Sequence, residues 1–319
     1  RTHIDKGNPC DVDAELWTTQ LDELISYEPA EMIAVVEAGM RVGELDRLLG
    51  EGGQEWSVDA HPDATVGGVI AAAAVSPRRL KVGAVRDTLL EAEVVTGDGR
   101  LVRSGARTVK NVTGYDLHKL VAGSLGTLGV IVQAALKLRP RPAARRTIRM
   151  AGGPDLGREV LAAVPGAASV LITPGRVELR LEGWPEEVDQ QTHAAEKIAE
   201  VSEAVDEDPF PSARPWEDRP VVAEAAVPPS RLPELLAPPF DVWGALMGVG
   251  IAWVGLPDAD GSLDELRERA SALGGIAPVV KGPGGLGDGG VPAPDIQRGI
   301  KATFDPAGVL APGRSWGGI

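Results

Sequence analysis

Short glycine-containing motifs in the first 130 residues constrain the fold of this chain more than any other feature. They occur at 65–68, 83–87, 110–117 and 123–131, between segments with strand or helix patterns. Glycine lets one backbone segment approach another, or a ligand, more closely than a side chain would allow. The motifs therefore predict an ordered first domain in which several turns pack tightly.

The motif Thr65-Val66-Gly67-Gly68 precedes an alanine-rich run that predicts a helix. Thr65 is the expected N-cap residue. The free N–H groups at such a helix start suit a pyrophosphate, and the two glycines would let a phosphate or another backbone approach. A plain glycine-rich turn into a buried helix is the competing interpretation.

Each of the other motifs also has a structural and a functional interpretation. Gly83–Asp87 contacts a ligand or merely carries a solvated pair of Arg86 and Asp87. Residues 110–117 approach a ligand or form a capping turn, in which Asp116 caps a helix. Residues 123–131 either pack closely against a flat or bulky group or form a tight helix-to-strand connection.

Hydrophobic periodicity predicts the elements around these motifs and divides the chain. The first part contains a strand at 32–37, a helix at 41–51, a hairpin at 91–103 and a strand at 128–138. Pro140–Pro142 marks the boundary. The second part contains a half-buried strand at 175–182, a helix from Pro185 to about Glu203, a loop at 205–220, a strand at 246–254 and a helix at 262–273. A flexible connection at 281–294 follows, and a last helix then carries Ile296, Ile300 and Phe304.

Composition excludes several classes of protein. With 46 acidic against 32 basic residues the net charge is −14, which disfavours a nucleic-acid binder or a polybasic membrane anchor. Cys10 is the single cysteine, so an intrachain disulfide is impossible and a cytoplasmic location is expected. The longest apolar run, Ala245–Leu256, is too short to span a bilayer. The four histidines lack metal-ligand spacing, which predicts no metal site.

The order and spacing of the motifs resemble the vanillyl-alcohol-oxidase-type, or PCMH-type, FAD-binding domain. They are most similar to the flavin-binding subunits of bacterial glycolate oxidase, and the tail Phe304–Arg314 matches that family's C-terminal signature. The resemblance implies an α+β fold: an FAD-binding domain at 1–140, a cap or substrate domain at 141–292 with an antiparallel sheet and helices on one face, and a segment at 293–319 that returns to the FAD domain.

The resemblance also implies which residues contact a non-covalently bound FAD. These are Thr2, Pro62, Thr65, Val66, Gly67, Gly68, Gly83, Arg86, Asp87, Lys110, Asn111, Gly114, Tyr115, Gly129, Val130, Ile131 and Arg314. Catalytic residues stay unknown, because no histidine cluster of the kind seen in hydroxy-acid relatives occurs here.

Some positions depart from the family pattern. Ala73, Val75 and Val82 replace polar residues, which predicts weaker flavin binding. Arg1-Thr2-His3 aligns with the end of the family's first phosphate-binding loop, so the resemblance implies that the first strand and most of that loop are missing. We expect residues 1–319 to bind FAD weakly, and a chain extended upstream to bind it.

Three functions are compatible with these observations. The first is the FAD-binding subunit of a 2-hydroxy-acid oxidase, working with a second flavin subunit and an iron–sulfur subunit, peripheral to the inner membrane through these partners. The second is a non-catalytic scaffold subunit that has lost FAD. The third is an independent FAD-dependent oxidase. The sequence does not identify the substrate or the electron acceptor.

Overall fold

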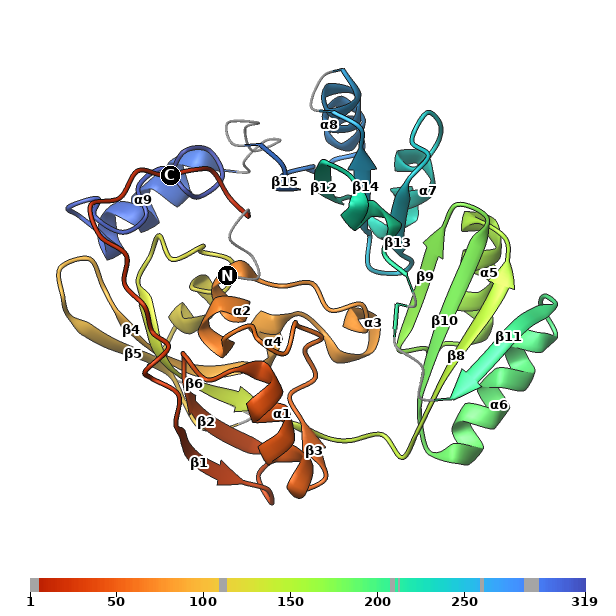
Figure 1. Cartoon of the computed structure of the whole chain (residues 1–319), viewed down its shortest axis with the longest axis horizontal. Helices are drawn as coiled ribbons and strands as arrows, with labels where there is room; N and C mark the ends of the chain where they lie inside the picture. The colour runs from red at the N-terminus through yellow and green to blue at the C-terminus, as the bar shows by residue number, and fades with distance from the viewer. Residues whose placement is uncertain (1–5, 109–113, 207–209, 212, 259–260, 284–292) are drawn as a thin grey trace. The chain divides into compact units, whose positions relative to one another are not determined.

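The computed structural model describes residues 6–108, 114–206, 210–211, 213–258, 261–283 and 293–319. These residues form two compact units (Figure 1). The first unit comprises the described residues up to Ser76, then Gly83–Arg141, and finally 293–319. The second comprises Pro77–Val82 and the described residues from 142 to 283. The main crossing from the first unit to the second falls between Arg141 and Pro142.

The first unit is built on a five-stranded antiparallel sheet. Its strand order is β1 (Leu24–Glu28), β2 (Ile33–Glu37), β6 (Val130–Lys137), β4 (Leu89–Val95) and β5 (Leu101–Gly105). The predicted hairpin at 91–103 is confirmed, since Val95 pairs with Leu101 around the glycine turn. Two short strands, β3 (Gln54–Glu55) and β7 (Arg139–Pro140), pair separately.

Helices bury one face of this sheet. In α1 (Val42–Glu51), Val42, Leu45 and Leu49 recur at helical spacing and are all buried, as the sequence predicts. In α2 (Val66–Ala72), Val69 and Ile70 enter the same core, together with side chains from β2, β4 and β6. The short helix α4 (Val85–Thr88) and the 3₁₀ turn η1 (Leu117–Leu120) lie against β4.

The second unit is built on an eight-stranded antiparallel sheet. Its strand order is β11 (Val201–Asp206), β8 (Ala144–Ala151), β10 (Arg176–Gly183), β9 (Ser169–Thr173), β13 (Trp243–Leu246), β14 (Ile251–Leu256), β12 (Val221–Ala226) and β15 (Val279–Lys281). The helices are α3 (Arg79–Val82), α5 (Pro154–Ala163), α6 (Pro185–Glu196), α7 (Leu232–Leu235) and α8 (Ser262–Ala272), with 3₁₀ turns η2 (Pro215–Asp218) and η3 (Pro229–Arg231).

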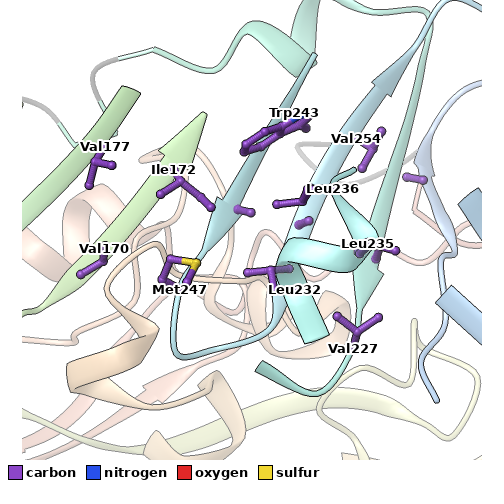
Figure 2. Close-up of a cluster of buried hydrophobic side chains, with 14 of the residues drawn as sticks. Val170, Ile172, Val177, Val227, Leu232, Leu235, Leu236, Trp243, Met247 and Val254 are labelled. Carbon is purple, nitrogen blue, oxygen red and sulfur yellow. The ribbon is translucent and has the colours of Figure 1, made fainter. Parts of the chain in front are cut away.

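One hydrophobic core runs along this sheet. It joins Val170 and Ile172 of β9 to Trp243 of β13 and to Leu232 and Leu235 of α7 (Figure 2). The predicted antiparallel sheet is confirmed. Since apolar side chains alternate along these strands, one face is free to carry polar groups.

Three expectations about the second unit are wrong in detail. The strand predicted at 246–254 is a hairpin, β13–β14, because Gly248 and Gly250 adopt φ of 77° and 82° and turn the chain. The helix from Pro185 ends at Glu196, because the residues from Val201 instead add the edge strand β11 to the sheet. The polar face of β10 is buried rather than solvated.

The last helix, α9 (Pro294–Phe304), and the tail that follows it fold with the first unit. The Gly97 N–H donates to the Phe304 carbonyl at 3.1 Å. The Asn8 side chain donates to the carbonyls of Gly313 and Ser315 at 3.2 and 3.1 Å. The two ends of the described chain therefore meet in this unit. The functional roles predicted for the segments stay predictions.

Candidate cofactor site

Thr65 caps helix α2 as the sequence predicts. Its backbone is extended, and its Oγ1 accepts a hydrogen bond from the Gly68 N–H at 3.1 Å. This bond satisfies one of the donors that a helix start leaves unpaired. The threonine side chain therefore orders the turn that the sequence singled out.

The two N–H groups of this turn that precede Gly68 already have backbone acceptors. The Val66 N–H donates to the Met40 carbonyl at 2.9 Å, and the Gly67 N–H donates to the Ala38 carbonyl at 2.7 Å. A Cβ atom on Gly67 would lie 2.8 Å from the Ala38 Cβ. Here the glycine admits another backbone, the chain leaving β2, which was one of the two interpretations left open.

Gly68 differs from Gly67 because it is exposed. A Cβ atom there would meet only the Thr65 Oγ1 within 4 Å. Helix α2 is also short, and the N–H groups of Val66 and Gly67 are already paired. The turn therefore offers a cofactor the open surface beside Gly68 rather than a set of free N–H donors. Pro62, another predicted contact, is exposed, and its carbonyl accepts from the Gly43 N–H at 2.9 Å.

The fourth motif packs on the C-terminal end of α2. The Gly123 N–H donates to the Ile70 carbonyl at 3.0 Å, and the Leu125 N–H donates to the Ala71 carbonyl at 2.9 Å. A Cβ atom on Gly7 would lie 2.7 Å from both the Leu125 Cδ1 and the Arg314 carbonyl oxygen. The structure thus brings α2, the 123–126 turn and the C-terminal Arg314 into one neighbourhood.

Val130 and Ile131 begin β6, and Gly129 directly precedes it. A Cβ atom on Gly129 would lie 2.2 Å from the Val94 Cγ1, and Ile131 is buried in the sheet core. These positions make the tight strand connection that was the competing interpretation. Their contact with FAD stays a prediction.

The 83–87 motif forms a capped turn beside α2. Asp87 accepts a hydrogen bond from the Ala84 N–H at 2.9 Å, and Gly83 has a φ of 82°. Arg86 and Asp87 are both exposed, and their side chains lie 3.8 Å apart. The solvated pair therefore exists, and the Arg86 guanidinium remains in reach of a solvent-side anion.

The third motif is described only in part. Lys110 and Asn111, like Thr2, lie outside the described residues. Gly114 has a φ of 80°, and Tyr115 is 88 % exposed, so its ring offers an open aromatic face. Asp116 precedes η1 but does not cap it, because its carboxylate pairs with the Lys119 ammonium at 2.9 Å.

His118 is a buried group that sequence reasoning missed. Its backbone N–H donates to the Ser104 Oγ at 3.1 Å, and only 3 % of the residue is exposed. Burial lowers the pKa of His118, while the Asp116 carboxylate and a hydrogen bond to the Leu89 backbone oppose this effect. A lone histidine in a polar motif gives no periodic signal that would predict burial.

This burial predicts a pH dependence of stability. The pKa of His118 is lowered in the folded state. As the pH falls through the ordinary pKa of a histidine, the unfolded state therefore takes up a proton before the folded state does. We expect the free energy of unfolding to fall by up to about 1.4 kcal/mol per pH unit in this range. Urea unfolding between pH 7.5 and 5.5 measures it, and His118→Gln should flatten the profile. An unchanged profile in the variant would assign the dependence to other groups.

Ala73, at the end of α2, has a left-handed backbone with φ 44° and ψ 54°. This conformation costs a residue with a Cβ roughly 1–2 kcal/mol, and asparagine tolerates it better than alanine. We expect Ala73→Asn to raise the free energy of unfolding by up to about 1 kcal/mol. Urea unfolding tests this, with Ala71→Asn inside the right-handed helix as the control. A gain in both variants would contradict the explanation.

Within the described residues, no three His, Cys, Asp or Glu side chains gather as metal ligands. No helix in this part of the chain combines the length and the apolar character needed to cross a membrane.

Comparisons with known proteins bear on the cofactor and the fold of this chain, while the individual site residues stay predictions. Residues 6–105 match the family described as an FAD binding domain. The chain is 26 % identical over 312 residues to the glycolate oxidase subunit GlcE of Escherichia coli, covering 92 % of this chain and 84 % of that protein. It is 39 % identical over 129 residues to D-lactate dehydrogenase of Archaeoglobus fulgidus and 32 % identical over 130 residues to the glycolate oxidase subunit GlcD of Bacillus subtilis.

These last two matches cover 40 % of this chain and 28 % of each relative. Among solved structures, an alkyldihydroxyacetonephosphate synthase superposes with a TM-score of 0.65 at 16 % identity, covering 92 % of this chain and 66 % of that one. The chain therefore carries an FAD-binding domain. The predicted fold class, the FAD cofactor and the resemblance to glycolate oxidase subunits are confirmed.

Proposed function

We propose that this chain, which carries an FAD-binding domain, is the FAD-binding subunit of a glycolate oxidase-type oxidoreductase that acts on a 2-hydroxy acid. One observation carries the proposal. The similarity to GlcE extends over 92 % of the chain and 84 % of that subunit, and so includes the second unit as well as the FAD-binding domain. The other two relatives named above match only 40 % of the chain each, which supports the cofactor more than the substrate.

The residues near α2 fit an FAD, but not through every predicted contact. Gly68 is exposed and Gly126 leaves open space, the exposed ring of Tyr115 offers a stacking surface, and Arg86 supplies a cation for a diphosphate. The N–H groups of Val66 and Gly67 do not fit this role, because the backbone occupies them. When bound, FAD would supply the two-electron oxidation, and the protein would bind and orient it.

The proposed partners are a second flavin subunit and an iron–sulfur subunit, in a cytoplasmic complex held at the inner membrane by those partners. The names of two relatives support a complex of several subunits, since GlcE and GlcD are both subunits of glycolate oxidase. An independent oxidase receives less support, because no catalytic base is recognisable among the described residues of the second unit.

A scaffold subunit without FAD is the second candidate. It is favoured by the internal hydrogen bonds of Val66 and Gly67, and by the apolar residues Ala73, Val75 and Val82. Such a subunit would keep the fold and bind the partner subunits without taking part in electron transfer.

Purification with the neighbouring gene products tests the proposal. We expect a yellow complex whose flavin absorption bleaches when glycolate or another 2-hydroxy acid is added without oxygen. Acid precipitation should release the flavin into the supernatant, because FAD is held non-covalently. Flavin that stays in the pellet would contradict the non-covalent mode. A complex in which only the partner carries flavin would favour the scaffold.

A further inference from the structure

Asn8 donates hydrogen bonds to three consecutive carbonyl groups in the last described segment of the chain. Its backbone N–H donates to the Arg314 carbonyl at 2.8 Å. Its side-chain amide donates to the carbonyls of Gly313 and Ser315 at 3.2 and 3.1 Å. All four residues belong to the first unit. One residue therefore fixes the backbone on both sides of Arg314.

The three carbonyls can converge on Asn8 because the chain turns at this point. Gly313 has a φ of 75°, in the left-handed region that suits glycine. The Arg314 N–H donates back to the Ala311 carbonyl at 3.1 Å. This internal bond shapes the turn, whereas the bonds from Asn8 attach the turn to another part of the chain.

The Arg314 side chain contacts the two residues that precede Asn8. Its Nη2 donates to the Lys6 carbonyl at 3.1 Å. A Cβ atom on Gly7 would lie 3.3 Å from the Arg314 Cγ and 2.7 Å from the Arg314 carbonyl oxygen. Gly7 also has a φ of 92°, which residues with a side chain rarely adopt. Residues 6–8 therefore contact both the backbone and the guanidinium of Arg314.

The turn that carries Arg314 lies beside the 123–126 turn, which belongs to the fourth glycine motif. The same Cβ position on Gly7 is 2.7 Å from the Leu125 Cδ1. The 123–126 turn bonds in addition to the C-terminal end of α2, through the carbonyls of Ile70 and Ala71. Direct contacts inside the first unit thus connect Arg314 with α2.

Unfavourable backbone conformations concentrate in the same neighbourhood. Five described residues other than glycine have a positive φ, and three of these are Ala73, Leu125 and Ala311, at 44°, 53° and 41°. Ala73 ends α2, Leu125 lies in the 123–126 turn, and Ala311 accepts the Arg314 N–H. Such conformations are costly for a residue with a Cβ and cluster at ligand sites, where the surrounding contacts enforce them. Their concentration here indicates a ligand site rather than a loose connection.

We propose that Asn8 is a positioning residue for the cofactor: it fixes the turn at 313–315, so that the Arg314 guanidinium lies beside the 123–126 turn as a cation for the FAD diphosphate. This inference rests on the proposed function. A guanidinium stays charged at any pH near neutrality, and the diphosphate carries the charge of oxidised FAD. The family-matched segment, residues 6–105, contains Asn8 but not Arg314.

The test compares Asn8→Ala with Gln54→Ala in the full-length, flavin-free protein. Gln54 is a matched control, because its side-chain amide also donates to a backbone carbonyl of the first unit, that of Pro29 at 2.8 Å, but lies on β3. Asn8→Ala keeps the backbone bond to Arg314 and loses the two side-chain bonds. We expect it to raise the Kd for FAD by about three- to tenfold, and Gln54→Ala to change the Kd less than about twofold.

The salt dependence of the Kd shows whether the effect involves a charge. The Kd of the wild type should rise with ionic strength, because salt screens the attraction between Arg314 and the diphosphate. Arg314→Met should reduce this rise, although it leaves the carbonyls that Asn8 contacts in place. Asn8→Ala should reduce the rise as well. Gln54→Ala, which removes a merely structural contact, should keep the salt dependence of the wild type.

A double variant tests the link between the two residues. If Asn8 acts through Arg314, adding Asn8→Ala to Arg314→Met should not weaken FAD binding any further. Hydrogen exchange of the flavin-free protein gives a separate measure of the anchoring. The amides of Arg314, Ser315 and Gly318 should exchange faster in Asn8→Ala, while the amides of β6 exchange as in the wild type.

Several results would overturn the positioning role. These are an unchanged Kd in Asn8→Ala, a loss of affinity that keeps the salt dependence of the wild type, and additive losses in the double variant. Unchanged exchange at the turn would show that Asn8 does not hold it. If the wild-type protein takes up no FAD, the proposed function fails and with it the cofactor part of this inference, while the exchange data still decide the anchoring.

Discussion

Replacing Asp305 with alanine should lower the free energy of unfolding of the first unit by about 3–5 kcal/mol. Asp305 is 2 % exposed, and its Oδ2 pairs with the Lys301 ammonium at 2.6 Å. It also accepts from the N–H groups of Val309 and Leu310 at 3.1 and 2.8 Å. Burial pushes the pKa of Asp305 upward, but these donors outweigh it and hold the pKa below its usual value.

The large effect follows because the variant leaves the Lys301 ammonium buried without a carboxylate partner. Lys301 also donates to the carbonyls of Thr127 and Leu310, so its charge would stay buried without its carboxylate. Hydrogen exchange at the amides of β2 and β6 measures the loss. Asp295→Ala is the control, because Asp295 forms an exposed pair with Arg298 on the same helix and should matter by less than about 0.5 kcal/mol. Equal losses in the two variants would contradict this account.

Replacing Gly67 with valine should cost roughly 3–5 kcal/mol of stability and weaken FAD binding. Any Cβ at this position would lie 2.8 Å from the Ala38 Cβ and 3.0 Å from the Ala38 carbonyl oxygen. Overpacking of this kind costs about 1–3 kcal/mol. Moving α2 away would also break the hydrogen bonds from Val66 and Gly67 to Met40 and Ala38, at about 1 kcal/mol each.

Gly299→Ala serves as the control for Gly67→Val. Gly299 lies inside α9, and no atom falls within 4 Å of the position of its Cβ. Alanine should stabilise that helix by roughly 0.5–1 kcal/mol. Urea unfolding measures both variants. A tolerated Gly67→Val would mean that α2 does not pack on the chain after β2 as closely as described.

Much of the fold follows from local patterns. Alternating or continuous apolar residues predicted β2, β6 and β10, and helical spacing predicted α1 and α9. The pattern failed where two buried strands follow each other: β13 and β14 form one apolar run, and only the left-handed Gly248 and Gly250 separate them. It failed again at β11, which is a strand because β8 pairs with it, and no local signal marks that pairing.

The candidate site was predictable in its parts but not in its hydrogen bonds. The Thr65 cap depends on residues three positions apart, which the sequence displays. The N–H groups of Val66 and Gly67 donate to Met40 and Ala38, which lie more than twenty residues away in the sequence. The sequence therefore predicted free N–H donors at a helix start where the backbone donors are already paired. The burial of the β10 charges and of His118 likewise depends on distant segments.

FAD binding by this protein can be measured directly by titrating the full-length, flavin-free protein with FAD. The quenching of flavin fluorescence and the shift of the visible flavin absorption report the bound fraction. We expect saturable binding of one FAD per chain, weakened by Gly67→Val and unaffected by Gly299→Ala. No saturable binding, or binding that Gly67→Val leaves unchanged, would contradict this expectation.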